Sequence, residues 1–276
     1  MNDTFNIQRF WWLLKKTILE RPLQFLGILG LTFFSAWLMY NLRIPTVKQD
    51  VLSTRSALWV SFQADAFGLG LFLGGCLIGG VVFAYFSDAA KGYGYLTLPV
   101  SNLEKWLCGL VIIIGFTLIY HGFFRILDTI FVNSYHASLN AFFANNRDYH
   151  KFFNLAKVMS FSSTELKFYY VFYGIITSLI AVGAFYFNKL ALIKTVISGI
   201  TVLIAALFIN SQIASMVFGK EVRITALMGN VYVLGKNYDS IYLTESSAAI
   251  LDFILYVMLP ITLWLIAFIR LREKEF

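Results

Sequence analysis

Six long apolar blocks run through this chain, and they constrain its fold more than any other feature. They cover residues 22–40, 58–86, 106–132, 168–187, 196–218 and 248–271. A hydrocarbon core of about 30 Å takes roughly 20 helical residues to cross, and only a helix satisfies its own backbone hydrogen bonds there. Barrel strands would alternate apolar and polar residues, which a run such as GLVIIIGFTLIY does not. The blocks therefore predict an all-α integral membrane protein with six transmembrane helices.

The composition excludes an ordinary soluble protein. Hydrophobic residues make up 59% of the chain and charged residues 13%, whereas a soluble domain carries about 45–50% apolar and roughly 25% charged residues. The formal charge of +7 suits a protein that meets an anionic lipid leaflet and gives no reason to expect nucleic acid as a partner. No internal repeat or low-complexity linker divides the sequence, so residues 1–276 are predicted to form a single transmembrane domain.

The positions of lysine and arginine bear on which side the termini face. With six spans both termini share a side, and cytoplasmic loops are enriched in these residues. The two sides carry nearly equal numbers of them, but the KK pair at Lys15 and Lys16 and the tail RLREKEF directly adjoin spans, where such charges have the most effect. We therefore expect both termini to be cytoplasmic.

Residues 4–20, which precede the first block, have the pattern of an amphipathic helix. Phe5, Trp12 and Leu19 are seven residues apart, and the basic residues lie largely on another face. Aromatic residues opposite basic ones favour a helix that lies in the membrane interface before the chain enters the bilayer at Pro22. The alternative is that this segment is simply the solvated end of the first span.

Motifs for catalysis, nucleotides and metals do not fit this sequence. GNVYVLGKN begins like a phosphate-binding loop, but its second glycine is one residue late and Asn237 stands where Ser or Thr would bind magnesium. The three histidines form no HExxH pair, and two isolated cysteines make no metal site. The loops contain no recognisable nucleophile beside a base. We expect a chain that is not an enzyme and holds no metal or cofactor of its own.

The segment TLPVSNLEKWLCG between the second and third blocks has the character of soluble protein. Ser101 and Glu104 have the spacing of a capping box, which predicts a helix from about Asn102. Pro99 keeps Leu98 out of the helical region, so this helix should start sharply.

Upstream of this start, Ser87 is a candidate cap for a short helix that Gly92 and Gly94 would stop. The connection between spans two and three is thus predicted to be a compact surface against which a partner could push. The alternative is that the capping box only starts a helix.

Three parts of the sequence together resemble the membrane subunits of bacterial ATP-binding-cassette exporters of the type-2 class. They are LPVSNLEKWLCGLV after two spans, the leader FNIQRFWWLLKK and the basic tail RLREKEF. The resemblance implies an interfacial elbow helix over residues 5–20 and a short coupling helix within residues 87–105 that docks on a separate ATPase. The long loop 133–167 departs from the commoner family pattern, in which the loop before span six is the elaborate one.

The same resemblance implies the partners and the location of the protein. A second permease copy or a paralogue would pair with this chain among the membrane lipids of a bacterial cytoplasmic (inner) membrane. ATP and magnesium would bind to the ATPase subunit. The residues to which the resemblance gives the coupling role are Ser87, Lys91, Pro99, Ser101, Glu104 and Lys105.

Charged side chains within the spans predict an intramembrane polar cluster. His121, Arg125 and Asp128 share one helical face because they are spaced four and three residues apart. Antiparallel spans would put Asp65 at a depth similar to that of Arg125, with Asp252 near the same end. An unpaired charge in hydrocarbon costs at least ~2.5 kcal/mol, so these groups should pair or face water. They would form either a latch that fixes helix packing or a substrate gate.

Small and amide residues mark two further faces. Glycines four residues apart on span two predict close helix packing, and amides in span five predict hydrogen bonds between helices or, alternatively, a pathway lining. The residues concerned are Gly70, Gly74, Gly75 and Gly79 on span two, and Asn210 and Gln212 on span five.

The function expected from these features is that of a permease subunit of an exporter that moves an amphipathic or lipid-like substrate. One alternative is a non-transporting membrane scaffold or assembly subunit of an envelope complex. Another is a proton-coupled carrier that uses Asp65, Arg125 and Asp128, although no inverted repeat or broken midplane helix is visible.

Overall fold

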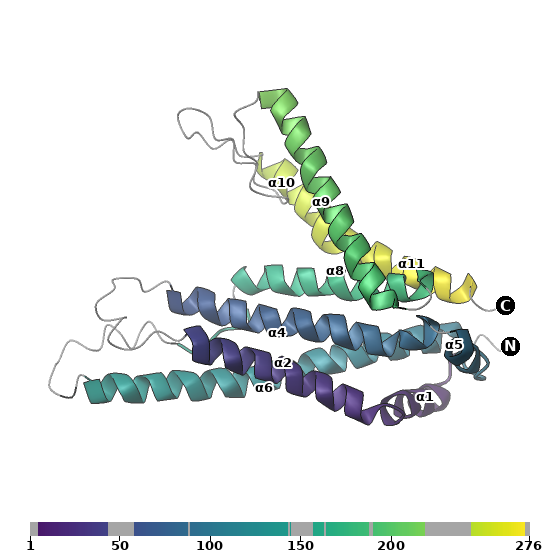
Figure 1. Cartoon of the computed structure of the whole chain (residues 1–276), viewed down its shortest axis with the longest axis horizontal. Helices are drawn as coiled ribbons and strands as arrows, with labels where there is room; N and C mark the ends of the chain where they lie inside the picture. Colours follow the sequence, from purple (N-terminus) through teal and green to yellow (C-terminus); the bar gives the residue numbers. More distant parts are fainter. Residues whose placement is uncertain are drawn as a thin grey trace. The chain divides into compact units, whose positions relative to one another are not determined.

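The computed structural model describes residues 5–43, 58–87, 89–142, 144, 157–162, 164–187, 190–218 and 244–273, and all regular structure in them is helical. The α-helices are α1 (Ile7–Leu19), α2 (Pro22–Arg43), α4 (Leu58–Val82), α5 (Ala89–Leu96), α6 (Asn102–Phe142), α8 (Thr164–Tyr186), α9 (Ala191–Phe218), α10 (Glu245–Phe253) and α11 (Leu259–Glu273) (Figure 1). A 3₁₀ turn covers Ala84–Ser87, and a π-helical stretch, Ile254–Met258, joins α10 to α11.

Six helical stretches in the described residues are long and apolar enough to cross a membrane. They are Pro22–Arg43, Phe62–Val82, Asn102–Phe142, Leu166–Tyr186, Ala191–Ile213 and Ala249–Glu273. Each contains or largely overlaps one of the predicted apolar blocks, so the prediction of an all-α, multi-pass membrane protein agrees with the fold.

The third of these stretches is much longer than its apolar block. α6 has 41 residues, which at about 1.5 Å per residue make a helix of about 60 Å, twice the thickness of a hydrocarbon core. The expectation that a loop begins at Asn133 is therefore wrong. Residues 133–142 contain no glycine or proline, and Tyr135 and Leu139, one turn apart, continue the buried face of the helix.

The predicted glycine stops between the second and third spans are also wrong. α5 runs through both Gly92 and Gly94. A Cβ atom on Gly92 would lie 2.9 Å from the backbone oxygen of Tyr85, so the glycine here permits a close approach of two backbone segments instead of ending a helix.

α1 is a helix of its own and not the end of the first span. Regular helix stops at Glu20 and Arg21, and Pro22 begins α2, at the position where a missing N–H costs no hydrogen bond. At the other end of α1, the Asn6 side chain caps the first turn.

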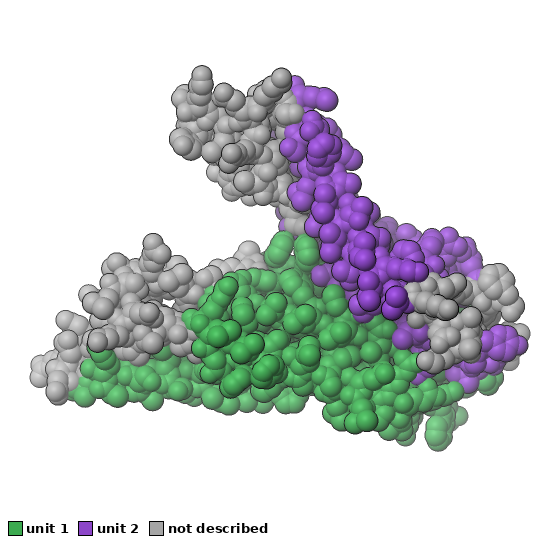
Figure 2. All heavy atoms as spheres, in the orientation of Figure 1, with its two compact units in different colours: residues 1–82, 99–173 green, residues 83–98, 174–276 purple. Residues whose placement is uncertain are grey.

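The chain forms two compact units, coloured separately in Figure 2. Unit 1 comprises Met1–Val82 and Pro99–Tyr173, and unit 2 comprises Phe83–Leu98 and Gly174–Phe276. In unit 1, α2, α4 and α6 pack against one another, and α1 packs against α6 and α2 (Figure 1). α2 and α4 run in opposite directions, and the end of α2 lies near the start of α4.

In unit 2, residues 83–98, here named the link, pack against the later part of α8 and against α11. The Phe83 ring lies 5.9 Å from that of Phe185 and 6.0 Å from that of Trp264, and the Phe86 ring lies 4.7 Å from Phe185. Aromatic contacts of this kind anchor the connection between spans two and three to the two helices.

α9 of unit 2 exposes apolar side chains around its circumference. Val202, Leu203 and Ile204 are successive residues, each about 100° apart on a helix, and all three are exposed. A helix that is apolar on all sides belongs in lipid or in contact with other membrane helices.

Candidate functional site

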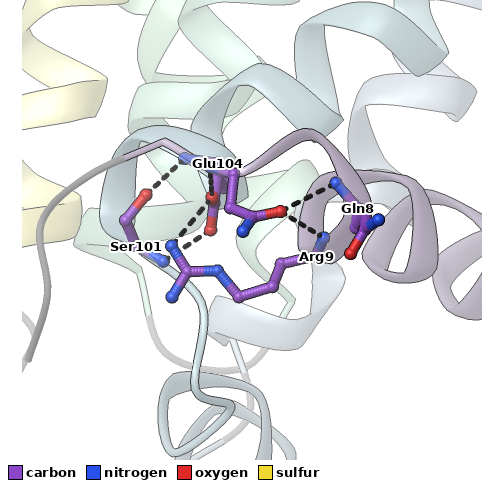
Figure 3. Close-up of polar contacts among 5 residues, drawn as sticks. Gln8, Arg9, Ser101 and Glu104 are labelled. Atoms are coloured by element: carbon purple, nitrogen blue, oxygen red, sulfur yellow. Dashed lines mark hydrogen bonds and ion pairs between the residues drawn. The ribbon is translucent and has the colours of Figure 1, made fainter.

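The carboxylate of Glu104 joins the start of α6 to the start of α1. Its Oε2 accepts a hydrogen bond from the Ser101 N–H at 2.8 Å, and the Glu104 N–H donates to the Ser101 hydroxyl at 3.3 Å. Both bonds of the predicted capping box are thus present. The other oxygen, Oε1, accepts from the Asn6 N–H at 2.6 Å and lies 3.3 Å from the Arg9 guanidinium. Figure 3 shows Glu104 between Ser101 and the first turn of α1.

We name Asn6, Arg9, Ser101 and Glu104 the α1 clamp. The local sequence favours it, because the Asn6 Oδ1 accepts from the backbone N–H groups of Gln8 and Arg9 and so turns the N-terminus of α1 towards α6. The Glu104 side chain is fully buried. A buried carboxylate is stable only when it is paired and hydrogen-bonded, so the clamp depends on all of these donors.

The middle of α1 also packs against α6. Leu13 and Thr17 are buried, and the Cys108 thiol lies 3.8 Å from the Thr17 hydroxyl. The opposite side of α1 exposes Trp11 and Trp12, with the Lys15 ammonium over both rings at 5.3 and 5.6 Å. α1 thus has one face that packs against α6 and an opposite face, aromatic and basic, that is exposed.

Arg21, two residues beyond the end of α1, reaches the end of α4. The Arg21 guanidinium donates to the Val81 carbonyl at 3.2 Å, where the unpaired carbonyls and the dipole of a helix C-terminus favour a cation. Val81 and Glu104 flank the link in the sequence. The two ends of α1 therefore hold the two helix ends from which the link departs.

The residues predicted to couple to an ATPase occupy different environments. Ser101, Glu104 and Lys105 are buried, whereas Pro99 is exposed. The backbone of Ser87 ends the 3₁₀ turn and that of Lys91 lies in α5, but the side chains of both are outside the described part of the structure.

Sequence reasoning missed Tyr93. Its side chain is 70% exposed on α5, and the signal was an aromatic residue between two glycines in a short segment next to membrane spans. An exposed aromatic side chain of this kind is a common anchor in protein interfaces.

Asp128 forms the centre of a second polar site, about 36 Å along α6 from Glu104. Its Oδ1 accepts from the Tyr40 hydroxyl at 2.6 Å and from the Gln63 amide at 2.7 Å, and its Oδ2 accepts from the Met159 N–H at 2.7 Å. Tyr40, Gln63 and Asp128 are all buried. We name these four residues the Asp128 network, which joins α2, α4 and α6 to residues 157–162.

The charged residues predicted as one cluster are grouped differently. Asp65 accepts from the Tyr169 hydroxyl at 2.6 Å and lies 3.8 Å from the Arg43 guanidinium. Arg125 instead donates to the Met159 carbonyl at 2.5 Å. No ion pair joins Asp65 to Arg125 in the described residues, and the cation near Asp65 is Arg43 of α2.

The other two members of that prediction also have separate partners. One ring nitrogen of His121 lies 2.6 Å from the Tyr170 hydroxyl and the other 2.6 Å from the Thr117 carbonyl. Asp252 is a half-buried residue of α10 in unit 2.

Glycines of α4 receive aromatic rings from neighbouring helices. A Cβ atom on Gly70 would lie 2.2 Å from the Tyr120 hydroxyl, and one on Gly74 would lie 2.3 Å from the Phe116 ring. Gly75 and Gly79 are buried as well. On α9, Asn210 is half-buried and Gln212 is exposed.

Within the described ranges, no group of three His, Cys, Asp or Glu side chains could hold a metal ion. The chain matches no family model, no curated protein and no solved structure with which it was compared. The resemblance to exporter permeases therefore depends on features of its own sequence.

Proposed function

We propose that this chain is the permease subunit of an exporter that couples to a separate ATPase and moves an amphipathic or lipid-like substrate across the membrane. The observation that carries the proposal is the position of α1. Glu104 and Arg21 bond opposite ends of α1 to α6 and α4, at the two points from which the link departs.

This arrangement suits the transmission of force. A partner that displaces the link pulls on the ends of α4 and α6, and the α1 clamp makes α1 move with them. The Glu104 carboxylate at the centre of the clamp is buried, so its hydrogen bonds are stronger than they would be in water. The docking surface itself is formed by exposed residues of the link, with Tyr93 as the anchor.

The remaining parts have roles that follow from this assignment. ATP and magnesium bind to the ATPase, a second permease copy or a paralogue pairs with this chain, and lipid surrounds the apolar helices of unit 2. In a bacterial inner membrane with both termini cytoplasmic, α1 and the link face the ATPase, and the Asp128 network lies at the opposite surface.

Co-purification tests the proposal. The full-length chain, isolated in mild detergent from its native membrane, should retain an ATP-binding-cassette ATPase, and Tyr93→Asp should reduce the retained ATPase by tenfold or more, since hot-spot residues contribute about 2 kcal/mol or more. Phe142→Ala is the matched control: Phe142 is an exposed aromatic residue at the far end of α6, and its replacement should leave retention unchanged.

Two outcomes would contradict the proposal. If the Tyr93→Asp variant retained as much ATPase as the unaltered chain, the link would not be the docking surface. An ATPase-free complex with large envelope proteins would favour the scaffold function instead.

A further inference from the structure

Residues 157–162, here named the strap, are held at the end of unit 1 by side chains that bind their backbone. Gln63 donates to the Lys157 carbonyl at 3.0 Å, Asp128 accepts from the Met159 N–H at 2.7 Å, and Arg125 donates to the Met159 carbonyl at 2.5 Å. The strap itself contains no helix before α8 begins at Thr164.

The strap also places an aromatic ring and a buried side chain against α4 and α6. The Phe161 ring lies 5.0 Å from that of His121 and 5.6 Å from that of Phe67. The Met159 side chain is buried, whereas Ser160 between them is exposed. Met159 and Phe161 therefore face the first half of α4 and the middle of α6, and Ser160 faces away from them.

The two charges that hold Met159 have no contact with each other. Arg125 and Asp128 are three residues apart on one face of α6, a spacing at which opposite charges pair directly. In the structure, the guanidinium instead donates to the Met159 carbonyl, and the carboxylate accepts from the Met159 N–H. Departure of the strap would let the guanidinium and the carboxylate meet.

We propose that the strap is a releasable closure over the end of unit 1 opposite α1. In the closed arrangement Met159 lies between Arg125 and Asp128, and in the open arrangement the two side chains form a direct ion pair. A buried carboxylate without hydrogen bonds is costly, and in both arrangements Asp128 keeps its bonds from Tyr40 and Gln63. The strap can therefore open without unfolding the three helices. This inference is independent of the proposed function.

Cysteine labelling tests the release. In the full-length chain with Cys76→Ala and Cys108→Ser, a reporter at Met159→Cys should react slowly with maleimide in detergent. Gln63→Leu, which removes the bond to the Lys157 carbonyl and leaves Arg125 and Asp128 able to pair, should accelerate its labelling by about threefold or more, since a hydrogen bond contributes about 0.5–1.5 kcal/mol net.

Two controls make the result specific to the strap. Ser160→Cys, which is exposed, should label at the same rate with and without Gln63→Leu. Leu71→Cys, at a fully buried site of α4, should stay protected in both. Equal labelling of Met159→Cys with Gln or Leu at position 63 would overturn the proposal. Faster labelling of Leu71→Cys would also overturn it, because unit 1 as a whole would then be loosened.

A double substitution tests the direct ion pair. Met159→Pro removes the N–H that Asp128 binds but leaves both charged side chains free to pair. Combined with Arg125→Ala, it should lower the unfolding midpoint by more than the two single losses added together. Two substitutions that merely break the same strap contact would instead give less than that sum. An additive or smaller loss would therefore exclude the open arrangement.

Discussion

The Glu104 carboxylate accepts a hydrogen bond at 2.6 Å from the backbone N–H of Asn6, 98 positions earlier in the chain. A single side chain thus closes the first turn of its own helix and also fixes the first turn of α1.

Replacement of Glu104 should destabilise unit 1. Glu104→Gln removes the charge that pairs with Arg9 and turns one acceptor into a donor that faces buried N–H groups, at a cost of about 1–3 kcal/mol. Thermal unfolding of the purified chain in detergent measures the change. Glu20→Gln is the control, because the exposed Lys16–Glu20 pair at 3.6 Å should contribute less than about 1 kcal/mol. Equal effects of the two variants would argue against the clamp.

A methyl group at Gly70 should disturb the packing of α4 on α6. The new Cβ of Gly70→Ala would meet the Tyr120 hydroxyl at 2.2 Å, and overpacking typically costs about 1–3 kcal/mol. Gly115 is a glycine of α6 with nothing within 4 Å of its Cβ position, so Gly115→Ala should be neutral or stabilising by up to about 1 kcal/mol through helix propensity. Unfolding midpoints in detergent that rank the two variants in the opposite order would contradict this packing.

The two aspartates at the same end of unit 1 should differ sharply in their sensitivity. Asp128→Asn presents an amide to the donors of Tyr40, Gln63 and Met159 and should cost about 3–5 kcal/mol, as for a broken buried charge network. Asp65 has a side chain that is 48% exposed and a partner 3.8 Å away, so Asp65→Asn should cost less than about 1 kcal/mol. Denaturant titration of both variants, monitored by tryptophan fluorescence, checks the difference. A similar loss in both would mean that burial does not set their roles.

The orientation can be tested in intact cells. With the native cysteines replaced, Ser160→Cys should react with a membrane-impermeant maleimide added outside, and Thr97→Cys on the link should react only after permeabilisation. Both positions are exposed, so access to the reagent decides the result. The reverse pattern would place the link on the outer surface, where no ATPase could reach it.

The number and approximate position of the membrane helices follow from the sequence alone, because the length of an apolar block is a local property that lipid imposes. The start of α6 at Asn102 is predictable for a similar reason: Ser101 and Glu104 are three residues apart and satisfy each other's backbone. The local rule that a glycine ends a helix failed here, because it takes no account of the residues that the fold brings close to that glycine. Gly92 looked like a helix stop, but its lack of a side chain serves the approach of Tyr85.

Tertiary structure decided which groups those residues meet. The sequence shows that Asp65, Arg125 and Asp128 must be satisfied in the membrane, since an unpaired charge there is costly. It does not show that Arg43 is the cation for Asp65, or that a backbone segment beyond α6 lies between Arg125 and Asp128. Those partners are tens of residues away, and only the packing of the helices brings them within hydrogen-bonding distance.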